Sequence, residues 1–192
     1  MRNENIMKLT LAGMFAAMAF VCFSYLRIEI PMGGGLTGKI YIGHTFIILS
    51  ALLLGAKYGA LSGAIGLTLA DILAGYTTSA PPTFLAKFIL GWAVAFVAHK
   101  IYHLTTETSS NKINRIVLTA AIVGCVLNVL TEPFIRFGFK YFILGIPYQI
   151  AYLSALNCAV SMAISGVFSV ILTVFLYKAL AQSVLKNWKF KI

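Results

Sequence analysis

The sequence predicts an all-α integral membrane protein, a single bundle of six transmembrane helices with both termini in the cytoplasm. Three observations predict this class: 60% of the 192 residues are hydrophobic, only 10% are charged, and the mean hydropathy is +0.91. A soluble domain usually carries about 25% charged residues. Because so few charges cannot cover a surface in water, most of this surface is expected to face lipid. Residues 1–192 are expected to form one domain.

Six apolar runs are long enough to be interpreted as spans, since a hydrocarbon core about 30 Å thick needs roughly 20 apolar residues per helix. The second run is short, and the sixth extends toward the cytoplasm. The turn at residues 55–57 is tight, whereas residues 27–39 and 134–149 form long links that contain glycine. The predicted spans are Ile6–Leu26, Ile40–Leu54, Tyr58–Tyr76, Thr83–Tyr102, Ile116–Pro133 and Ile150–Tyr177.

The basic residues orient the bundle, because cytoplasmic loops carry an excess of Lys and Arg. With both termini inside, ten basic residues face the cytoplasm, and four, Arg27, Lys39, Arg136 and Lys140, lie in outer loops. The opposite orientation would reverse this bias. The net charge of +10 is therefore interpreted as topogenic. Nucleic acid is not an expected partner, because there is no basic stripe with interleaved aromatic residues.

The three cysteines, Cys22, Cys125 and Cys158, lie far apart in apolar runs and lack the spacing of a metal site. They are expected to be small buried side chains. No nucleotide-binding loop is present, so energy for transport would have to come from another protein. We therefore expect neither a cofactor nor a metal in this chain.

Six polar or ionisable side chains fall inside the predicted spans, where each costs free energy unless it is paired or hydrated. With the assigned orientation, all six lie in the outer half of the membrane. This placement predicts a binding cavity that opens outward and is closed over by the glycine-rich outer loops. The six residues are His44, Asp71, Lys87, Asn128, Glu132 and Asn157.

The charged members of this set also have structural interpretations. Asp71 and Lys87 could form a buried ion pair that only fixes helix packing. His44 could be a satisfied buried side chain, and Glu132 could cap a helix that ends at Pro133. Convergence of several of these residues on one ligand is a firmer expectation than any single assignment.

The amides and aromatic residues at the same level leave two alternatives open as well. Asn128 and Asn157 could be hydrogen-bonding links between helices. Tyr41, Phe84 and Tyr152 could belong to an interfacial aromatic belt. The same side chains would also suit a flat heterocyclic ligand, which aromatic rings stack against and polar groups orient.

The first predicted helix carries small residues on adjacent rows, at Ala12, Gly13, Ala16 and Ala17. Small residues let helices approach closely in a membrane. The rows therefore indicate either a surface for a partner protein or close packing within this chain.

The stretch from Lys39 to Lys87 carries a resemblance to a known family. Residues 52–66 read LLLGAKYGALSGAIG, and residues 81–88 read PPTFLAKF. Together with the length, the six-helix layout and the topology, these stretches resemble the S component of an energy-coupling factor (ECF) vitamin transporter. The S component is the substrate-binding subunit, and the resemblance is to the riboflavin-type or hydroxymethylpyrimidine-type branch.

The resemblance implies a protein of a prokaryotic plasma membrane that binds a vitamin or vitamin precursor near the outer face. The link Arg27–Lys39, with Gly33, Gly34, Gly35 and Lys39, would act as the gate. The small residues of the first helix would contact a transmembrane coupling subunit, and two cytoplasmic ATPases would complete the importer. The S component would topple in the membrane to release its substrate inside.

The expected function is therefore substrate capture, without catalysis, for a small heterocyclic vitamin. A hydroxymethylpyrimidine or vitamin B6-like compound is favoured, although riboflavin and pantothenate also fit a cavity of mixed charge. An intramembrane enzyme is disfavoured because His99 and His103 lie at the opposite membrane edge from His44, and no HExxH motif occurs. A stand-alone proton-coupled transporter is disfavoured as well. It would need charged groups through the full depth of the membrane, and the inner halves of the predicted spans have almost none.

Overall fold

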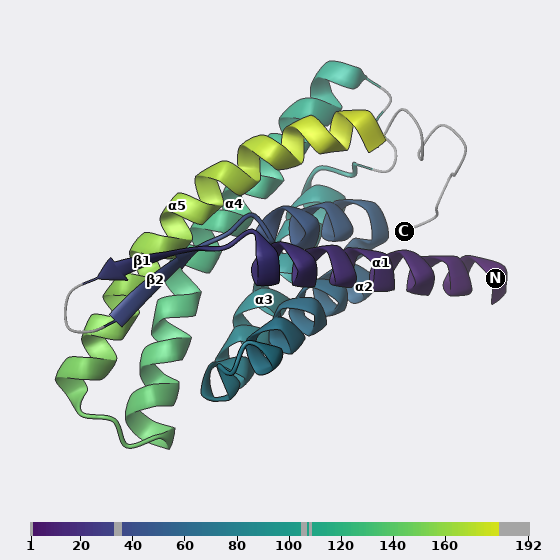
Figure 1. Ribbon diagram of the computed structural model, residues 1–192. Helices are drawn as coiled ribbons and strands as arrows, with labels where there is room; N and C mark the ends of the chain where they lie inside the picture. The colour runs from purple at the N-terminus through teal and green to yellow at the C-terminus, as the bar shows by residue number, and fades with distance from the viewer. Residues whose placement is uncertain (1, 33–35, 105–106, 108, 181–192) are drawn as a thin grey trace.

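The structure is a computed structural model that describes residues 2–32, 36–104, 107 and 109–180. In these ranges five helices are long and apolar enough to cross a membrane, which confirms the helical membrane class. Figure 1 shows the start of α1 and the end of α5 at one end of the molecule. The strands and the α4–α5 turn lie at the other end. The long helices are α1 (Arg2–Tyr25), α2 (His44–Leu73), α3 (Ala80–Ala95), α4 (Ser110–Gly138) and α5 (Tyr148–Leu180).

Helix α2 is a hairpin of two helical segments rather than one continuous rod. Gly55 interrupts it with φ 80° and ψ −175°, a conformation open essentially to glycine alone. The segments fold back on each other, so that the Ser50 and Ser62 hydroxyls lie 2.5 Å apart. A Cβ at Gly59 would clash with the backbone of Ala51. The tight turn predicted at residues 55–57 is therefore present.

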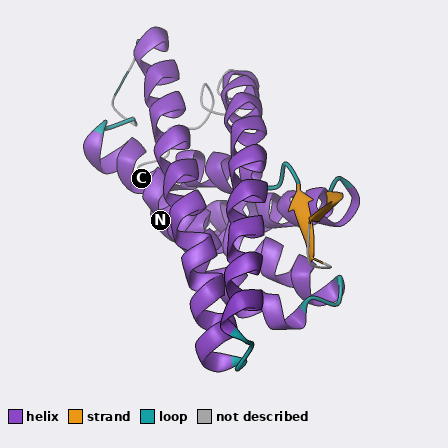
Figure 2. Cartoon of the chain, turned by 90° about the vertical axis from the view of Figure 1, so that its left-hand side faces the viewer, coloured by secondary structure: helices purple, strands orange, loops and turns teal. Residues whose placement is uncertain are grey.

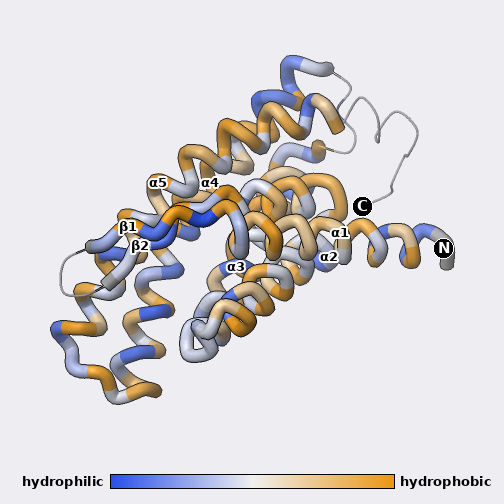
Figure 3. Tube along the Cα trace, in the orientation of Figure 1, coloured by the Kyte–Doolittle hydropathy of each residue, from blue (hydrophilic) through white to orange (hydrophobic). Residues whose placement is uncertain are grey.

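The α2 hairpin forms the centre of the bundle. Its most apolar stretch is 78% buried, compared with 33% for those of α1 and α5. The fully buried side chains of its first segment include Ile47, Ile48 and Leu49. Figure 3 shows that apolar residues run along the long helices, whereas polar residues gather at the strands and helix ends. The outward apolar side chains of the other helices are those expected to face lipid.

The link after α1 is an antiparallel β-hairpin, which the sequence predicted only as a loop. Strand β1 (Ile28–Met32) pairs with β2 (Leu36–Ile40), with Ile28 opposite Ile40 and Glu29 opposite Lys39. Figure 2 shows both strands at one edge of the helical bundle. The alternation of Ile28, Glu29 and Ile30 is a strand pattern, but it is short and ends at Pro31. The predicted gate residues Gly33, Gly34 and Gly35 lie outside the described residues.

The predicted long loop at residues 134–149 is wrong. Helix α4 continues through Pro133 to Gly138, and a π-helical turn, η3 (Phe139–Ile143), extends it. Only residues 144–147 separate this turn from α5. Glu132 consequently does not cap a helix end, because it is buried inside α4, which continues to Gly138. Proline normally ends a helix, and that rule misplaced the boundary here.

The fourth predicted span combines an α-helix with a π-helical segment. A 3-10 turn, η1 (Thr77–Ser79), leads into α3, where the two prolines occupy the first helical turn, as expected. A π-helical segment, η2 (Phe96–Ile101), follows α3 without a break. Together these elements bring Thr83 and Lys87 of α3 into the interior of the bundle.

Candidate ligand cavity

A cavity of about 290 Å³ lies where the β-hairpin meets the helices, at the end of the molecule away from the start of α1. Strand β2, the end of the α2 hairpin, α4 and α5 all contribute to its walls. Its lining is Phe23, Thr37, Gly38, Lys39, Tyr41, Asp71, Tyr76, Ser79, Arg136, Lys140, Ser154, Asn157, Cys158, Ser161 and Met162. The cavity is therefore mainly polar on the α5 side and aromatic beneath the hairpin.

One wall carries a hydrogen-bonded relay of charged groups. The Thr83 hydroxyl donates to Asp71 Oδ2 over 2.6 Å and accepts from Arg136 Nη2 over 3.0 Å. Arg136 also donates from Nε and Nη2 to Glu132 Oε1, at 3.1 and 2.9 Å. These contacts fix the Asp71 carboxylate and the Arg136 guanidinium at the cavity surface.

Behind this wall lies a second, fully enclosed cluster. Lys87 and Glu132 are both 0% exposed and form a direct ion pair. Lys87 Nζ lies 2.8 Å from His44 Nε2, 3.4 Å from Asn128 Oδ1 and 3.5 Å from Met162 Sδ. The cavity lining includes Met162 but none of the other four residues, which are His44, Lys87, Asn128 and Glu132. The cluster therefore lies behind the cavity wall, with Met162 between it and the cavity.

This arrangement corrects the structural pairing that the sequence suggested. Lys87 pairs with Glu132, and Asp71 pairs with Thr83 and not with Lys87. The correct partner lies 45 residues away on α4. The sequence offered no reason to prefer Glu132, because it had been assigned to a helix end at the interface.

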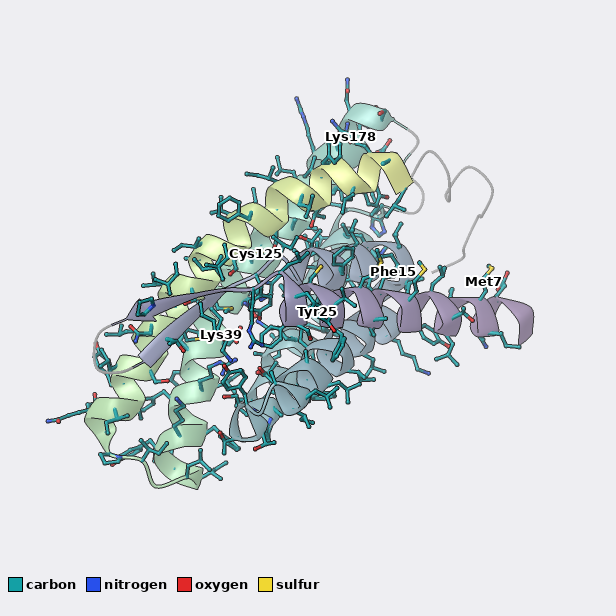
Figure 4. The ribbon with its side chains drawn as sticks, in the orientation of Figure 1. Met7, Phe15, Tyr25, Lys39, Cys125 and Lys178 are labelled. Carbon is teal, nitrogen blue, oxygen red and sulfur yellow. The ribbon has the colours of Figure 1, made fainter. Side chains whose placement is uncertain are left out.

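Contacts with Tyr76 hold the β-hairpin over the cavity. We call the four residues that make these contacts the latch: Arg27, Glu29, Lys39 and Tyr76. Lys39 Nζ lies 2.9 Å from the centroid of the Tyr76 ring, and the Arg27 guanidinium lies 5.6 Å from it. The Tyr76 hydroxyl donates to Glu29 Oε1 over 3.1 Å, and Arg27 Nε contacts the same oxygen at 3.0 Å. Such cation–π contacts stabilise by about 0.5–2 kcal/mol each. Figure 4 shows Lys39 directed from the strand toward the helices.

The Lys39 ammonium is partly withdrawn from water. Burial lowers its pKa to about 8, because desolvation disfavours the charged form. Asp71 and Glu29 oppose this shift, while Arg136 and Arg27 reinforce it. No carboxylate of the described residues forms an ion pair with Lys39. The cavity therefore contains a cation that lacks a matching anion.

The predicted ligand residues divide into three groups by position. Tyr41, Asp71, Asn157 and the predicted gate residue Lys39 line the cavity. His44, Lys87, Asn128 and Glu132 form the enclosed cluster behind it. Phe84 and Tyr152 lie on the outside of the bundle, 37% and 49% exposed, and are not part of the lining.

Tyr41 belongs to both the cavity and the supporting structure. Its ring stacks on His44 with centroids 4.6 Å apart and meets Phe23 edge-on at 4.9 Å. Its backbone N–H donates to Ser165 Oγ over 3.2 Å. Asn157, in contrast, has a buried Nδ2 with no hydrogen-bond partner among the described residues. An unsatisfied buried amide at a cavity wall is a donor available to a ligand.

The sequence analysis missed two cationic lining residues, Arg136 and Lys140. Both were counted as charges of an outer loop, because Pro133 and Gly138 indicated that the helix had ended. The i, i+4 spacing of Glu132 and Arg136 is a helical signal that favours continuation. Lys140 Nζ donates to Ser154 Oγ over 2.5 Å and so links η3 to α5.

The small residues of α1 lie on two different faces. Ala12 is buried, and the backbone of Ala16 packs so closely against α2 that a Cβ at Gly66 would clash with it. These two residues serve internal packing, which was one of the alternatives left open. Gly13 and Ala17 are exposed. Within the described residues no group of His, Cys, Asp or Glu could hold a metal ion.

A polar cavity covered by a strand hairpin and set into one end of an apolar helical bundle defines a membrane-embedded binding protein. A sequence model of the ECF-type riboflavin transporter S component family matches residues 3–182. The chain therefore belongs to the ECF-type riboflavin transporter S component family, which confirms the resemblance seen in the sequence. The comparison with curated proteins found no match.

Two solved structures have a similar fold. One is the S component of a bacterial ECF transporter, with a TM-score of 0.59, 21% identity, and coverage of 93% of this chain and 97% of that one. The other is the S component for biotin from an ECF-type ABC transporter, with a TM-score of 0.58 and 21% identity. That match covers 93% of this chain and 94% of the other. Both likenesses concern the fold.

Proposed function

We propose that this chain captures a small heterocyclic vitamin or vitamin precursor in the cavity beneath the β-hairpin and delivers it inward together with an ATP-driven coupling module. A hydroxymethylpyrimidine or vitamin B6-like compound is the favoured ligand. The observation that carries the proposal is the cavity itself. It is a partly open, polar cavity beneath the latched hairpin, at one end of a membrane bundle that belongs to the S-component family.

The size of the cavity supports a ligand with one ring. Small-molecule pockets have volumes of roughly 300–1,000 Å³, and this cavity of about 290 Å³ lies at the lower limit. A single heterocycle with short polar substituents suits that space better than a fused three-ring system. Tyr41 and Phe23 provide aromatic surface at one side of it.

The lining residues have distinct proposed roles in holding such a ligand. The unpartnered Asn157 amide donates to a ring nitrogen or carbonyl oxygen. Asp71, held by Thr83, accepts from an amino or hydroxyl group of the ligand. The enclosed residues His44, Lys87, Asn128 and Glu132 keep these groups in position and contribute to binding indirectly.

The proposed placement in the membrane follows from the basic residues and the α2 hairpin. We assign both termini to the cytoplasm and the cavity to the outer face of a prokaryotic plasma membrane, with six helical segments in the bilayer. The two segments of α2 supply the second and third of these. The first of them is short, so it reaches only about half of the hydrocarbon thickness at 1.5 Å per residue.

The proposed partners are a transmembrane coupling subunit and two cytoplasmic ATPases. The exposed Gly13 and Ala17 of α1 offer a flat surface for the coupling subunit, because small side chains permit close helix approach. Release to the inside would follow toppling of the S component against that subunit, after the latch opens.

Isothermal titration of the purified protein tests ligand capture. The probes are hydroxymethylpyrimidine, pyridoxine, riboflavin and pantothenate. We expect one of them to bind at micromolar or lower concentration, and Asn157→Trp to abolish that binding by filling the cavity. Tyr152→Trp, on the exposed face of the same helix, is the matched control and should bind like the wild type. Absence of binding for all four compounds to the folded wild type would contradict the proposal.

A further inference from the structure

The residues that line the cavity carry more positive than negative charge. Lys39, Arg136 and Lys140 line it, and among the described residues Asp71 is the only acidic member of the lining. The supporting cluster adds one cation, Lys87, and one anion, Glu132. Four cations against two anions leave a formal excess of two positive charges around the cavity.

The acidic groups present are already engaged by specific partners. Glu132 contacts both Lys87 and Arg136, and Asp71 accepts from Thr83. Lys140 has a hydroxyl partner, Ser154, and Lys39 has the Tyr76 ring. Among the described residues neither lysine forms an ion pair with a carboxylate. Both ammonium groups thus remain available to an anion inside the cavity.

The excess is unfavourable in the protein alone, since burying an unpaired charge costs free energy unless an opposite charge or water compensates. The hairpin nevertheless places Lys39 at the cavity, on the strand opposite the ion-paired Glu29. A cavity that held only a neutral ligand would gain nothing from three converging cations. A bound anion would offset their mutual repulsion and its own desolvation.

Resting on the function proposed above, we propose that the ligand carries an anionic group, a carboxylate or a phosphate monoester, which binds between Lys39, Arg136 and Lys140. The ring of the ligand then lies toward Tyr41 and Asn157. This assignment narrows the heterocyclic vitamins to their acidic or phosphorylated forms. It also gives the gate strand a direct part in binding, because Lys39 leaves the site when the hairpin opens.

Two matched ligand pairs test this inference. Nicotinate and nicotinamide differ in a carboxylate against a carboxamide on the same ring, and pyridoxine 5′-phosphate and pyridoxine differ in a phosphate against a hydroxyl. We expect the anionic member of at least one pair to bind the wild type at least tenfold more tightly than its neutral partner. The pair that shows the preference distinguishes a carboxylate from a phosphate ligand.

Single-charge variants assign the preference to the cavity. Lys39→Gln and Lys140→Gln should each reduce it about tenfold or more, and Lys39→Arg should retain most of it. Lys178→Gln is the control that removes one positive charge from the exposed end of α5, far from Lys39 (Figure 4). It should leave the preference unchanged.

The outcomes separate this inference from the function on which it rests. Binding of a neutral member as tight as that of its anionic partner overturns the anionic assignment and leaves vitamin capture standing. An anionic preference that survives both glutamine variants also overturns it. Absence of binding by every member of both pairs and by the wider vitamin panel overturns the two proposals together.

Discussion

At the scale of single residues, the interior of this protein is organised around Lys87. Its ammonium, carried by α3, contacts an imidazole from α2 and a carboxylate and an amide from α4, and all four side chains are almost completely buried. Because an unpaired ion inside hydrocarbon costs free energy, the sequence alone predicted that the ionisable residues of the spans would lie close to one another. It could not predict the partners, because pairing across α2, α3 and α4 depends on helix rotation. Arg136 escaped notice because its helix was expected to end before it.

Removal of Glu132 tests whether the enclosed cluster is structural. Glu132→Gln leaves Lys87 buried without a carboxylate, and breaking a buried pair costs about 3–5 kcal/mol. We expect a large fall in thermal stability in detergent, measured by intrinsic fluorescence. Restoration by Lys87→Met in the same chain would agree with this account, whereas an unchanged unfolding temperature for Glu132→Gln alone would contradict it.

Asp71 should behave differently from Glu132, because it lines the cavity and its hydrogen bond comes from a neutral hydroxyl. Asp71→Asn keeps the shape and one acceptor of the side chain. We expect ligand affinity to fall about tenfold, with a loss of unfolding free energy smaller than that of Glu132→Gln. Titration calorimetry and thermal unfolding on the same samples give the two quantities. An equal loss of stability in the two variants would place Asp71 in the structural cluster.

The Lys39 ammonium gives a pH dependence of defined sign. Its pKa of about 8 in the folded protein is below the ordinary 10.5. The unfolded chain therefore binds more protons between these values, and this group makes stability rise with pH across that window. The groups that act on it are Asp71, Arg136, Arg27 and Glu29, together with the Tyr76 ring.

Affinity for an anionic ligand should change with pH in the opposite direction. Deprotonation of Lys39 removes a positive charge from the cavity, so affinity for a carboxylate ligand should be level below about pH 7 and fall as pH rises through 8. A phosphate monoester, whose second pKa is about 6, should also lose affinity below pH 7. Titrations of the wild type and Lys39→Arg at pH 6 to 10 check this, because the arginine stays protonated. A fall of the same size in Lys39→Arg would assign the effect to another group.

At the scale of secondary-structure elements, the α2 hairpin and the β-hairpin illustrate what sequence reveals unequally. The turn at Gly55 was predicted because two apolar runs flank a glycine and a lysine. The β-hairpin was not predicted, because two five-residue strands around glycines provide too short an alternation. Its placement depends on long-range contacts with Tyr76 and with Ser165, and local pattern carries no information about these.

The α2 turn should tolerate no side chain at its two critical glycines. Gly55→Ala places a Cβ on a backbone with φ 80°, at a cost of about 1–3 kcal/mol. Gly59→Ala forces the two segments apart at Ala51. Gly138→Ala, a helical position with open space around it, is the control. Thermal unfolding should show clear losses for the first two variants only; equal effects in all three would contradict the hairpin packing.

The latch should govern how fast ligand leaves. Tyr76→Phe removes the hydroxyl that donates to Glu29 but keeps the ring beneath Lys39, whereas Tyr76→Leu removes both interactions. We expect dissociation to accelerate a few-fold in the first variant and about tenfold or more in the second. Stopped-flow release of bound ligand measures both rates. Equal rates in the wild type and Tyr76→Leu would show that the hairpin does not gate the cavity.

At the scale of the whole molecule, one end holds the cavity and the opposite end holds the start of α1 and the end of α5 (Figure 1). The sequence predicted both termini on one side and the cavity on the other from the order of the apolar runs and the depths of the polar residues. The assignment of those sides to cytoplasm and exterior, which depends on charge bias, stays a prediction. Helix α1 also has two distinct faces: Ala12 is buried in the bundle, whereas Gly13 and Ala17 are exposed. The sequence could not separate those rows, since all four residues are small.

The exposed row of α1 should matter for assembly and not for ligand capture. Ala17→Leu adds bulk to a surface that a coupling subunit would approach. We expect it to reduce co-purification with the coupling module several-fold while ligand affinity stays unchanged. Ala163→Leu, an exposed position on α5, is the matched control. Normal assembly of Ala17→Leu would move the partner surface away from this row.

The central claim, that the space beneath the hairpin holds the ligand, is tested most directly by native mass spectrometry of protein released gently from detergent after expression. The account predicts that the wild type carries one small molecule per chain, acidic in character, and that Asn157→Trp carries none while remaining folded. A wild-type protein that carries no such molecule and acquires none from a vitamin mixture would contradict it. So would an Asn157→Trp variant that carries as much as the wild type.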